Sequence, residues 1–307
     1  MASRDVLQIA EIIGSSKTEL YSISNNIEDN YRKAYIPKRD GTKRELTIPN
    51  ARLKFIQSKI VEEFLSRARV SKYAMAYRPG SSVQKNAAQH VRKKKIFKLD
   101  IHKFFDSIKY SDVKKYAFPA EQFSEDARVL LSILCYHKNG VPQGAPTSPA
   151  ISNIIMYDFD EKVGAWCRSK GISYTRYCDD MTFSGSFNEI EVKFFVEDAL
   201  ESMGLYLNAK KTAVISNGKR QTVTGIVVNK KLNTTKEYRR QIRQEVHYIR
   251  TYGLDSHMRR TDNFEDKLTY LRGLLGRIAF VLQTTPANYN LIDDKNYIQD
   301  LLKDLQG

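Results

Sequence analysis

The chain has 307 residues, of which 50 are Lys or Arg and 35 are Asp or Glu, so its formal net charge is +15. This surplus indicates a polyanionic partner, with nucleic acid favoured over a membrane. The three cysteines form no CxxC pair, and no apolar run approaches the roughly 20 residues that span a bilayer. These features exclude a disulfide framework, a zinc cluster and a membrane protein, and we expect a cytoplasmic location.

The first half of the chain is predicted to hold short helices, a basic hairpin and a strand. Residues 34–50 place Asp40-Gly41, a pair suited to a tight turn, between basic and apolar residues. We therefore expect a β-hairpin, followed by a helix that Asn50 caps. A short helix over "VQKNAAQHV" and a strand that ends at Asp100 come next.

The second half is predicted to alternate helices with further strands. After a helix at 123–136 and the loop "PQGAPT", another helix begins, with Ser148 as N-cap and Pro149 at its first position. "SYTRYCDDMTFSG" predicts two strands joined at Asp179 and Asp180. "LYLNAKKTAVIS" and "RQTVTGIVVN" are two more strand candidates, and the chain from residue 235 has helical spacing.

Three aspartates, Asp100, Asp179 and Asp180, follow apolar strands without a basic neighbour in the sequence. Clustered carboxylates repel one another unless a cation holds them, and hard oxygen ligands favour Mg²⁺. Two such ions about 4 Å apart would activate a 3′-hydroxyl and stabilise a pyrophosphate leaving group. Turn chemistry alone also explains an isolated Asp-Asp pair. The Asp179-Asp180 pair is therefore interpreted together with the motifs around it.

Four segments in chain order, "LDIHKFFDSI", "VPQGAPTSP", "YCDD" and "GLYLNAKKT", resemble the palm of reverse transcriptases. The resemblance covers about residues 34–229. It implies an α+β right-hand polymerase fold with fingers, a palm of antiparallel sheet and helices, and a helical thumb. The implied divisions are N-terminal helices at 1–33, fingers at 34–98 with part of 113–148, a palm at 99–229 and an RNA-binding thumb at 230–307.

The resemblance also assigns the catalytic residues. It implies that Asp100 and Asp179 bridge two Mg²⁺ ions, that Asp180 assists and that the backbone carbonyl of Ile101 adds a ligand. Lys211 matches the lysine that protonates the departing pyrophosphate, a role for which an ammonium is suited when it reaches the leaving oxygen. The adjacent Lys210 is the alternative.

The hairpin and the "PQGAP" loop resemble the nucleotide-binding parts of these enzymes. Lys38 and Arg44 match the residues that grip the triphosphate, and a guanidinium can bind phosphate through two parallel hydrogen bonds. A solvated surface position is an equally simple interpretation of Lys38. Gln143 matches the residue that touches the incoming sugar and base, and Gly144 allows close approach of the backbone.

Phe105 matches the bulky residue under the sugar of the incoming nucleotide, where the ring would clash with a ribose 2′-hydroxyl. The resemblance therefore implies that dNTPs are selected. Phe105 can also be explained as a core aromatic residue. We expect Phe104 to be the core member, because neighbours on a strand point to opposite faces.

Two short motifs, "NAAQH" at 86–90 and "VTG" at 223–225, resemble signatures of bacterial retron reverse transcriptases. A hydrogen bond on one helix face is the local alternative for the first motif. Residues 230–307 suffice for a thumb and leave no room for an added RNase H domain. The implied contacts with RNA or primer are Asn86, His90, Tyr177, Val223, Thr224, Gly225, Arg239 and Arg243.

The retron resemblance implies an RNA-directed DNA polymerase that reverse transcribes a structured noncoding RNA (msr-msd) into msDNA, starting from the 2′-hydroxyl of an internal guanosine. The implied partners are this RNA, dNTPs, a separate effector protein and host RNase H, in an anti-phage defence system. A group II-like or abortive-infection reverse transcriptase with a conventional primer is the first alternative. A non-catalytic RNA-binding scaffold is the second, and intact Asp100, Asp179, Asp180, Gln143 and Phe105 argue against it.

Overall fold

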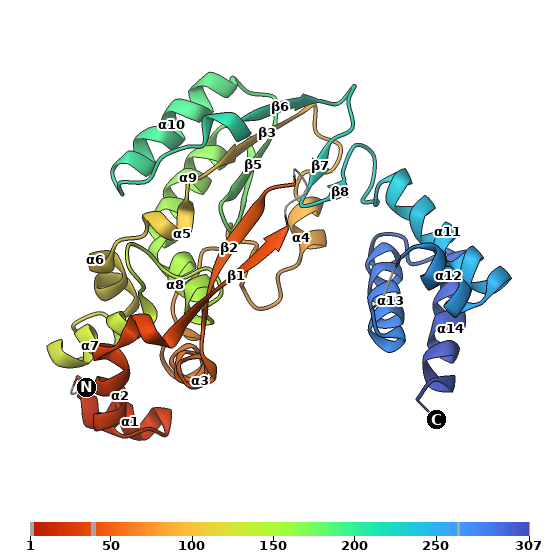
Figure 1. Ribbon diagram of the computed structural model, residues 1–307. Coiled ribbons are helices and arrows are strands. Elements are labelled where there is room, and N and C mark those ends of the chain that lie inside the picture. The colour runs from red at the N-terminus through yellow and green to blue at the C-terminus, as the bar shows by residue number, and fades with distance from the viewer. Residues whose placement is uncertain (1–2, 38–40, 263–264, 307) are drawn as a thin grey trace. The chain divides into compact units, whose positions relative to one another are not determined.

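The structure is a computed structural model that describes residues 3–37, 41–262 and 265–306. It divides into two compact units (Figure 1), one of residues 1–81 and 97–214 and the other of residues 82–96 and 215–307. Helices and short antiparallel sheets occur together, so the expected α+β class is confirmed. The divisions into fingers, palm and thumb stay a prediction.

The first unit contains most of the helices. Their bounds are α1 (Val6–Ile13), α2 (Lys17–Asn25), α3 (Ala51–Ile60), α5 (Phe104–Ser107), α6 (Tyr110–Asp112), α7 (Glu125–Cys135), α8 (Thr147–Ile155), α9 (Tyr157–Ser169) and α10 (Glu189–Glu201). Short 3₁₀ turns lie at Ile27–Asn30 and Ala209–Lys211, and π turns at Val61–Leu65 and Val113–Ala117.

The predicted basic hairpin is present. Strands β1 (Tyr31–Pro37) and β2 (Lys43–Pro49) pair antiparallel over their whole length. Asp40 lies outside the described residues, and Gly41 has a φ of +81°. The carboxamide of Asn50 accepts from the backbone amide of Leu53 at 2.9 Å, so the predicted cap of α3 is confirmed.

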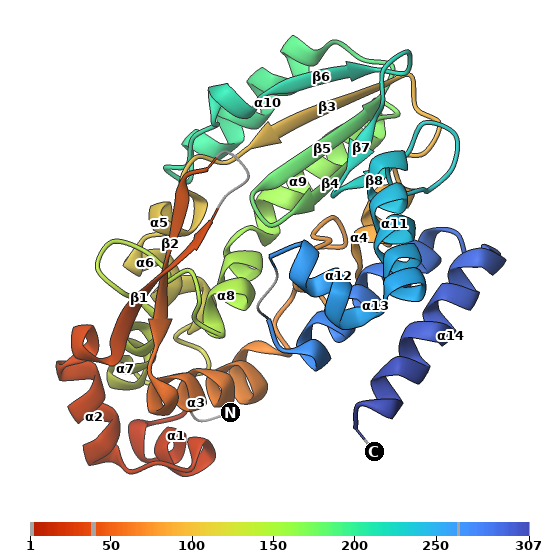
Figure 2. The same cartoon turned by 45° about the vertical axis from the view of Figure 1, so that its right-hand side comes forward.

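A four-stranded sheet (Figure 2) has the order β4 (Ser173–Tyr177), β5 (Asp180–Gly185), β3 (Lys95–Asp100) and β6 (Ala213–Ser216). Helix α9 packs along β4, and α10 packs along α9. Strands β4 and β5 are antiparallel and joined by a two-residue turn, as predicted. The strand expected over "LYLNAKKTAVIS" is confirmed only in its last four residues.

The expected start of α8 is wrong. The helix begins at Thr147, so Ser148 lies in its first turn instead of capping it. The physical reason is that the Ser148 hydroxyl donates to the carbonyl of Pro142 at 2.8 Å and so closes the preceding loop. The helix also ends at Ile155 before α9 starts at Tyr157.

The expected arrangement of Phe104 and Phe105 on a strand is also wrong. Strand β3 ends at Asp100, and both rings belong to the short helix α5. Phe104 is buried in the core, as predicted, and Phe105 packs against that core while partly exposed.

A buried ion pair joins α9 to β4. The guanidinium of Arg176 lies 2.6 Å from the carboxylate of Asp160, and both side chains are fully buried. The hydroxyl of Tyr174 also donates to Asp160, at 2.8 Å. Arg176 further donates to the carboxamide oxygen of Asn153 and to the backbone carbonyl of Cys178. One side chain therefore connects two helices with the β4–β5 turn.

The second unit is built around two small apolar clusters. Its elements are α4 (Val83–Ala88), β7 (Thr222–Val223), β8 (Ile226–Val227), α11 (Lys236–Tyr252), α12 (Leu254–Arg260), α13 (Lys267–Thr284) and α14 (Tyr289–Asp304). The first cluster gathers α4 with the β7–β8 hairpin around Val223 and Ile226. The second joins α11, α13 and α14 around Ile242, Leu271 and Ile298, and the predicted helical stripes supply it.

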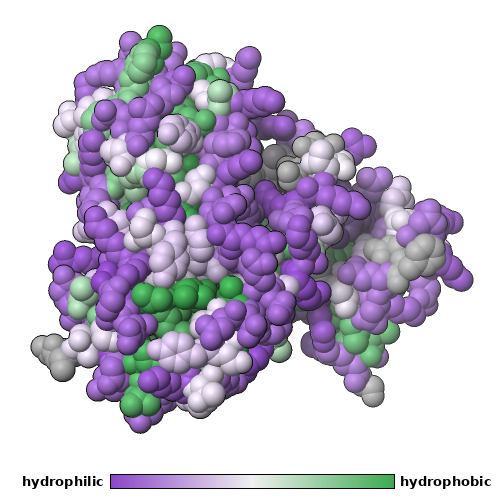
Figure 3. Space-filling view, turned by 60° about the vertical axis from the view of Figure 1, so that its left-hand side comes forward, coloured by the Kyte–Doolittle hydropathy of each residue, from purple (hydrophilic) through white to green (hydrophobic). Residues whose placement is uncertain are grey.

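The surface shown in Figure 3 is mostly hydrophilic, with hydrophobic side chains in small groups. Within the described residues, every helix is too short or too polar to cross a lipid bilayer.

Candidate active site

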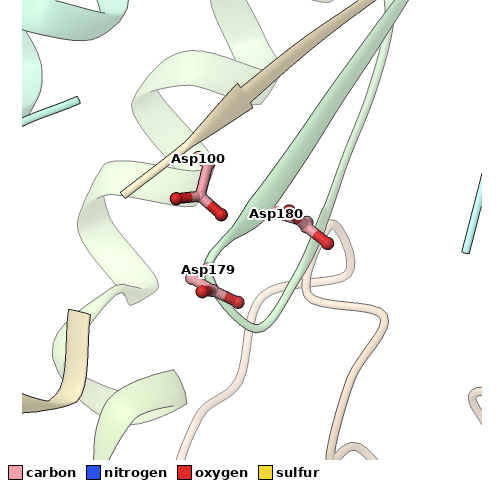
Figure 4. A group of neighbouring side chains, drawn as sticks. All are labelled: Asp100, Asp179 and Asp180. Carbon is pink, nitrogen blue, oxygen red and sulfur yellow. The ribbon is translucent and has the colours of Figure 1, made fainter. Parts of the chain in front are cut away.

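The three predicted aspartates lie together (Figure 4). Asp100 ends β3, Asp179 lies in the β4–β5 turn, and Asp180 begins β5. One carboxylate oxygen from each lies within 4.8 Å of the others. The sheet explains this cluster, because β3 and β5 are neighbouring strands and the backbone amide of Ile101 donates to the carbonyl of Asp179 at 3.1 Å.

The turn that carries Asp179 has an unusual backbone. Cys178 has a φ of +61°, a region that residues other than glycine seldom occupy. Arg176 donates to the Cys178 carbonyl at 2.9 Å and so helps to hold this conformation. Burial raises the pKa of the Cys178 thiol to about 12, so the sulfur stays protonated at neutral pH.

Burial and neighbouring negative charge raise the pKa values of Asp179 and Asp180. Burial, followed by the charge of Asp100, raises the pKa of Asp179. Burial, followed by the charges of Asp179 and Asp100, raises the pKa of Asp180 to about 6. Full ionisation of the cluster therefore costs free energy, and a cation bound by all three groups would offset that cost.

Asp100 is held by two side chains from the segment after α10. The ammonium of Lys211 lies 2.7 Å from one carboxylate oxygen of Asp100, and the carboxamide of Asn208 donates to the other at 3.1 Å. Burial lowers the pKa of Lys211, but the hydrogen bond and charge of Asp100 outweigh burial and leave the pKa raised. Of the two adjacent lysines, Lys211 makes this contact, while its role as general acid stays a prediction.

The donor set fits a divalent cation. Asp100, Asp179 and Asp180 offer only carboxylate oxygens, which suit hard ions such as Mg²⁺. The Lys211 ammonium already lies against Asp100, so this position attracts positive charge. The implied ligand role of the Ile101 carbonyl stays a prediction.

Phe105 is held in place by its backbone. The amide of Val141 donates to the Phe105 carbonyl at 3.0 Å. Any side chain at Gly140 would begin 2.5 Å from that same oxygen, so only glycine fits without a shift. The segment before the "PQGAP" loop thus fixes the position of α5.

The loop that carries Gln143 is joined to β2. The backbone amide of Thr47 donates to the Gln143 carbonyl at 3.1 Å, and Gly144 has a φ of +133° where a Cβ would lie 2.9 Å from the Thr47 oxygen. Gln143 also lines a cavity of about 330 Å³ beside Thr47 and Asp106. Arg44 is exposed on β2, and Lys38 lies outside the described residues.

The two retron motifs meet in the second unit. The carboxamide of Asn86 donates to the Thr224 hydroxyl at 3.4 Å, and that hydroxyl donates to the carbonyl of Val83 at 3.2 Å. Thr224 and Gly225 form the β7–β8 turn with φ values of +46° and +81°. Asn86, His90 and Val223 are buried. Asn86 stabilises the turn through its bond to Thr224, and Val223 packs in the apolar cluster beside α4. Their implied RNA contacts, and that of the half-buried Tyr177, stay predictions.

The two arginines predicted to contact RNA differ in their surroundings. Arg239 donates to the Asn233 side chain at 2.5 Å and also bonds the carbonyl of Thr234, which fixes its guanidinium beside the start of α11. Arg243 is exposed on the same helix. Both line a basic cavity of about 490 Å³.

The sequence analysis missed three residues that shape the site: Asn208, Gly140 and Arg176. Asn208 lies in the segment "GLYLNAKKT", which resembles a palm motif, but the motif does not reveal the bond between Asn208 and Asp100. Gly140 precedes the "PQGAP" loop, and no pattern marks its contact with Phe105. Arg176 lies among strand residues, where a fully buried guanidinium is unexpected.

Residues 36–251 match the family described as "Reverse transcriptase (RNA-dependent DNA polymerase)". The chain belongs to the reverse transcriptase family. Members of this family are nucleotidyltransferases, and the resemblance found in the sequence is confirmed.

Curated relatives of this reverse transcriptase are retron enzymes. It is 32% identical to the retron Mx65 reverse transcriptase of Myxococcus xanthus, over 80% of this chain and 60% of that protein. It is 30% identical to the retron Ec86 enzyme of Escherichia coli, over 71% and 70% of the two chains. The retron Ec83 enzyme of Escherichia coli is also 30% identical, over 90% and 89%. The chain thus spans less than two thirds of the Myxococcus protein and most of the Ec83 enzyme.

Solved structures that match this chain include a telomerase from Candida albicans in complex with a fragment of telomeric RNA. The TM-score is 0.47 at 11% identity, over 86% of this chain and 59% of that one. A foamy viral protease-reverse transcriptase with double-stranded DNA has a TM-score of 0.47 at 15% identity, over 90% and 43% of the two chains.

Replacing Asp179 by Asn is expected to weaken divalent-metal binding by about 10-fold or more, because a carboxylate ligand is lost from the cluster. Mn²⁺ serves as the probe, and its binding to the protein alone is measured by electron paramagnetic resonance. Asp158→Asn, at an exposed position of α9, is the matched control and should bind as the wild type does. Equal Mn²⁺ binding by both variants would contradict the metal site.

Proposed function

We propose that this reverse transcriptase copies a structured noncoding RNA (msr-msd) into DNA from the 2′-hydroxyl of an internal guanosine and so produces msDNA. The main support is about 30% identity to retron enzymes over most of the chain. The contact between Asn86 and Thr224 adds to it, because it joins the two motifs that resemble retron signatures.

In the proposed mechanism, Asp100, Asp179 and Asp180 would hold two Mg²⁺ ions, with the Ile101 carbonyl as a further ligand. When bound, the ions supply activation of the attacking hydroxyl and charge stabilisation of the pyrophosphate. Asn208 orients Asp100 through its 3.1 Å hydrogen bond. The carboxylates therefore act as a preorganised set.

The remaining steps belong to side chains around this set. Lys211 releases Asp100 and gives the proton on its Nζ to the departing pyrophosphate. Its side chain is 56% exposed, which leaves room for it to turn toward a substrate. Gln143 contacts the incoming nucleotide, Phe105 excludes a ribose 2′-hydroxyl, and Arg44 with Lys38 binds the triphosphate.

The proposed setting is the bacterial cytoplasm, with the noncoding RNA, its msDNA product and dNTPs bound to the protein. Host RNase H would trim the template, and a separate effector protein would complete an anti-phage defence system. The net charge of +15 supports binding of the polyanionic partners, which are the RNA and the msDNA.

The complex purified from its host is expected to extend DNA from its own RNA with dNTPs and Mg²⁺. The double variant Asp179→Asn, Asp180→Asn should lose activity by about 1000-fold, equivalent to about 4 kcal/mol of transition-state stabilisation. Asp158→Asn should retain it. Equal synthesis by all three proteins would rule out this catalytic centre, whereas no synthesis by the wild-type complex would favour a non-catalytic scaffold.

A debranching enzyme separates the two priming modes. If synthesis starts from a 2′-hydroxyl, cleavage of the 2′,5′ linkage releases the DNA from the RNA. A product that debranching leaves unchanged would instead favour a conventional 3′-hydroxyl primer.

Phe105→Ala is expected to reduce discrimination against ribonucleotides by about 10- to 100-fold, because the ring no longer fills the space of the 2′-hydroxyl. The ratio of kcat/KM for dNTP and rNTP measures this change. Phe104→Leu alters the neighbouring buried ring and should leave the ratio unchanged. An unaltered ratio in Phe105→Ala would show that the ring does not exclude the hydroxyl.

A further inference from the structure

The helical part of the second unit contains a cavity of about 440 Å³ between α11 and the segments of α12 and α13, which we call the thumb cavity. Its position is distinct from the carboxylate cluster, since all of its lining belongs to the second unit. The cavity has a partly buried polar floor and an exposed aromatic wall. Both features differ from the apolar contacts that hold these helices together.

Four polar side chains form the floor as one hydrogen-bonded network. Arg277 donates to both carboxylate oxygens of Glu245, at 2.8 Å and 2.5 Å. The hydroxyl of Tyr270 donates to Glu245 at 3.1 Å, and Nε2 of His257 lies 2.9 Å from that hydroxyl. His257 is 4% and Tyr270 8% exposed, whereas the side chains of Arg277 and Glu245 are 30% and 16% exposed, so the network is partly buried and its hydrogen bonds restrain it.

This floor suits an uncharged, polar ligand. The carboxylate of Glu245 is paired by Arg277, so the floor carries little net charge. Burial lowers the pKa of His257, which keeps the imidazole neutral. Donors and acceptors that carry little net charge together match the edge of a nucleobase better than a free phosphate.

The wall of the thumb cavity offers an aromatic face. The ring of Tyr248 is 38% exposed. The carboxamide of Gln244 donates to its hydroxyl at 3.2 Å, which restricts the ring. The ring lies stacked over His257 at a centroid distance of 6.2 Å. A restrained, exposed tyrosine is the kind of platform on which unpaired bases stack.

The positive charge of α11 suits the phosphate group of a nucleotide. This helix contains five Lys or Arg and two Glu, and Arg239, Arg240 and Arg243 line the basic cavity on the same helix. Helix α11 therefore offers positive charge to the backbone of a nucleic acid that binds along it.

We propose that the thumb cavity binds one unpaired base of the RNA, stacked on Tyr248 with its polar edge toward the His257–Tyr270–Glu245–Arg277 floor. This inference rests on the proposed function only in taking RNA as the partner. It adds recognition of a single-stranded nucleotide, which is the part of a structured RNA whose base edges are accessible to a protein.

The test measures the affinity of the full chain for four 10-nucleotide homopolymer RNAs, a 16-base-pair RNA duplex and free nucleoside monophosphates. Tyr248→Ala is expected to weaken binding of at least one single-stranded RNA by about 10- to 100-fold, and that of the duplex by less than about twofold. Tyr248→Phe keeps the ring and should bind within about threefold of the wild type. Tyr289→Ala removes a 79% exposed tyrosine from α14 and serves as the control.

Unchanged binding of all four single-stranded RNAs by Tyr248→Ala would overturn the proposal, as would an equal loss on the duplex. Free nucleotides that bind as tightly as the homopolymers would show a nucleotide site instead of an RNA contact. Because these measurements need no DNA synthesis, failure of the cavity and failure of the proposed enzymatic function give different results. DNA synthesis by the wild type is assayed separately.

Discussion

The candidate active site depends on the buried contact between Arg176 and Asp160. A fully buried guanidinium is costly to desolvate, and it is tolerated here because Asp160, Asn153 and the Cys178 carbonyl satisfy its fork of donors. These bonds join α9 and α8 to the β4–β5 hairpin. They therefore stabilise the hairpin turn, with its positive φ at Cys178. Its conformation decides where Asp179 and Asp180 lie.

The carboxylate cluster is the consequence of that support. Neighbouring strands bring Asp100 beside Asp179 and Asp180, and burial makes their mutual repulsion stronger than it would be in water. Lys211 and Asn208 bond Asp100 from a separate segment. The site is therefore assembled from three parts of the chain. The repulsion among its carboxylates favours the binding of cations.

Much of the fold could be predicted because local patterns agree with it. The hairpin of β1 and β2, the cap at Asn50 and the strands around Asp179 follow from turn chemistry and alternation. Ser148 misled the prediction because its hydroxyl bonds to a carbonyl six residues earlier. A local rule cannot reveal which of two backbone partners a serine selects.

The rest of the site depends on contacts between distant segments. Nothing near Arg176 in the sequence names Asp160 as its partner, and nothing at Gly140 indicates that Phe105 lies against it. Asn86 and Thr224 are separated by 138 positions, and the motifs alone did not predict their hydrogen bond. Motif order identified the aspartates, whereas the residues that position them became evident only in the structure.

The most direct test of this account is single-nucleotide incorporation by Arg176→Lys on an RNA template with a DNA primer. Lysine retains the positive charge beside Asp160 but lacks the fork that also reaches the Cys178 carbonyl. The account predicts a folded protein whose incorporation rate is about 10- to 100-fold lower than that of the wild type, because the aspartates shift. A folded variant with the wild-type rate would contradict it.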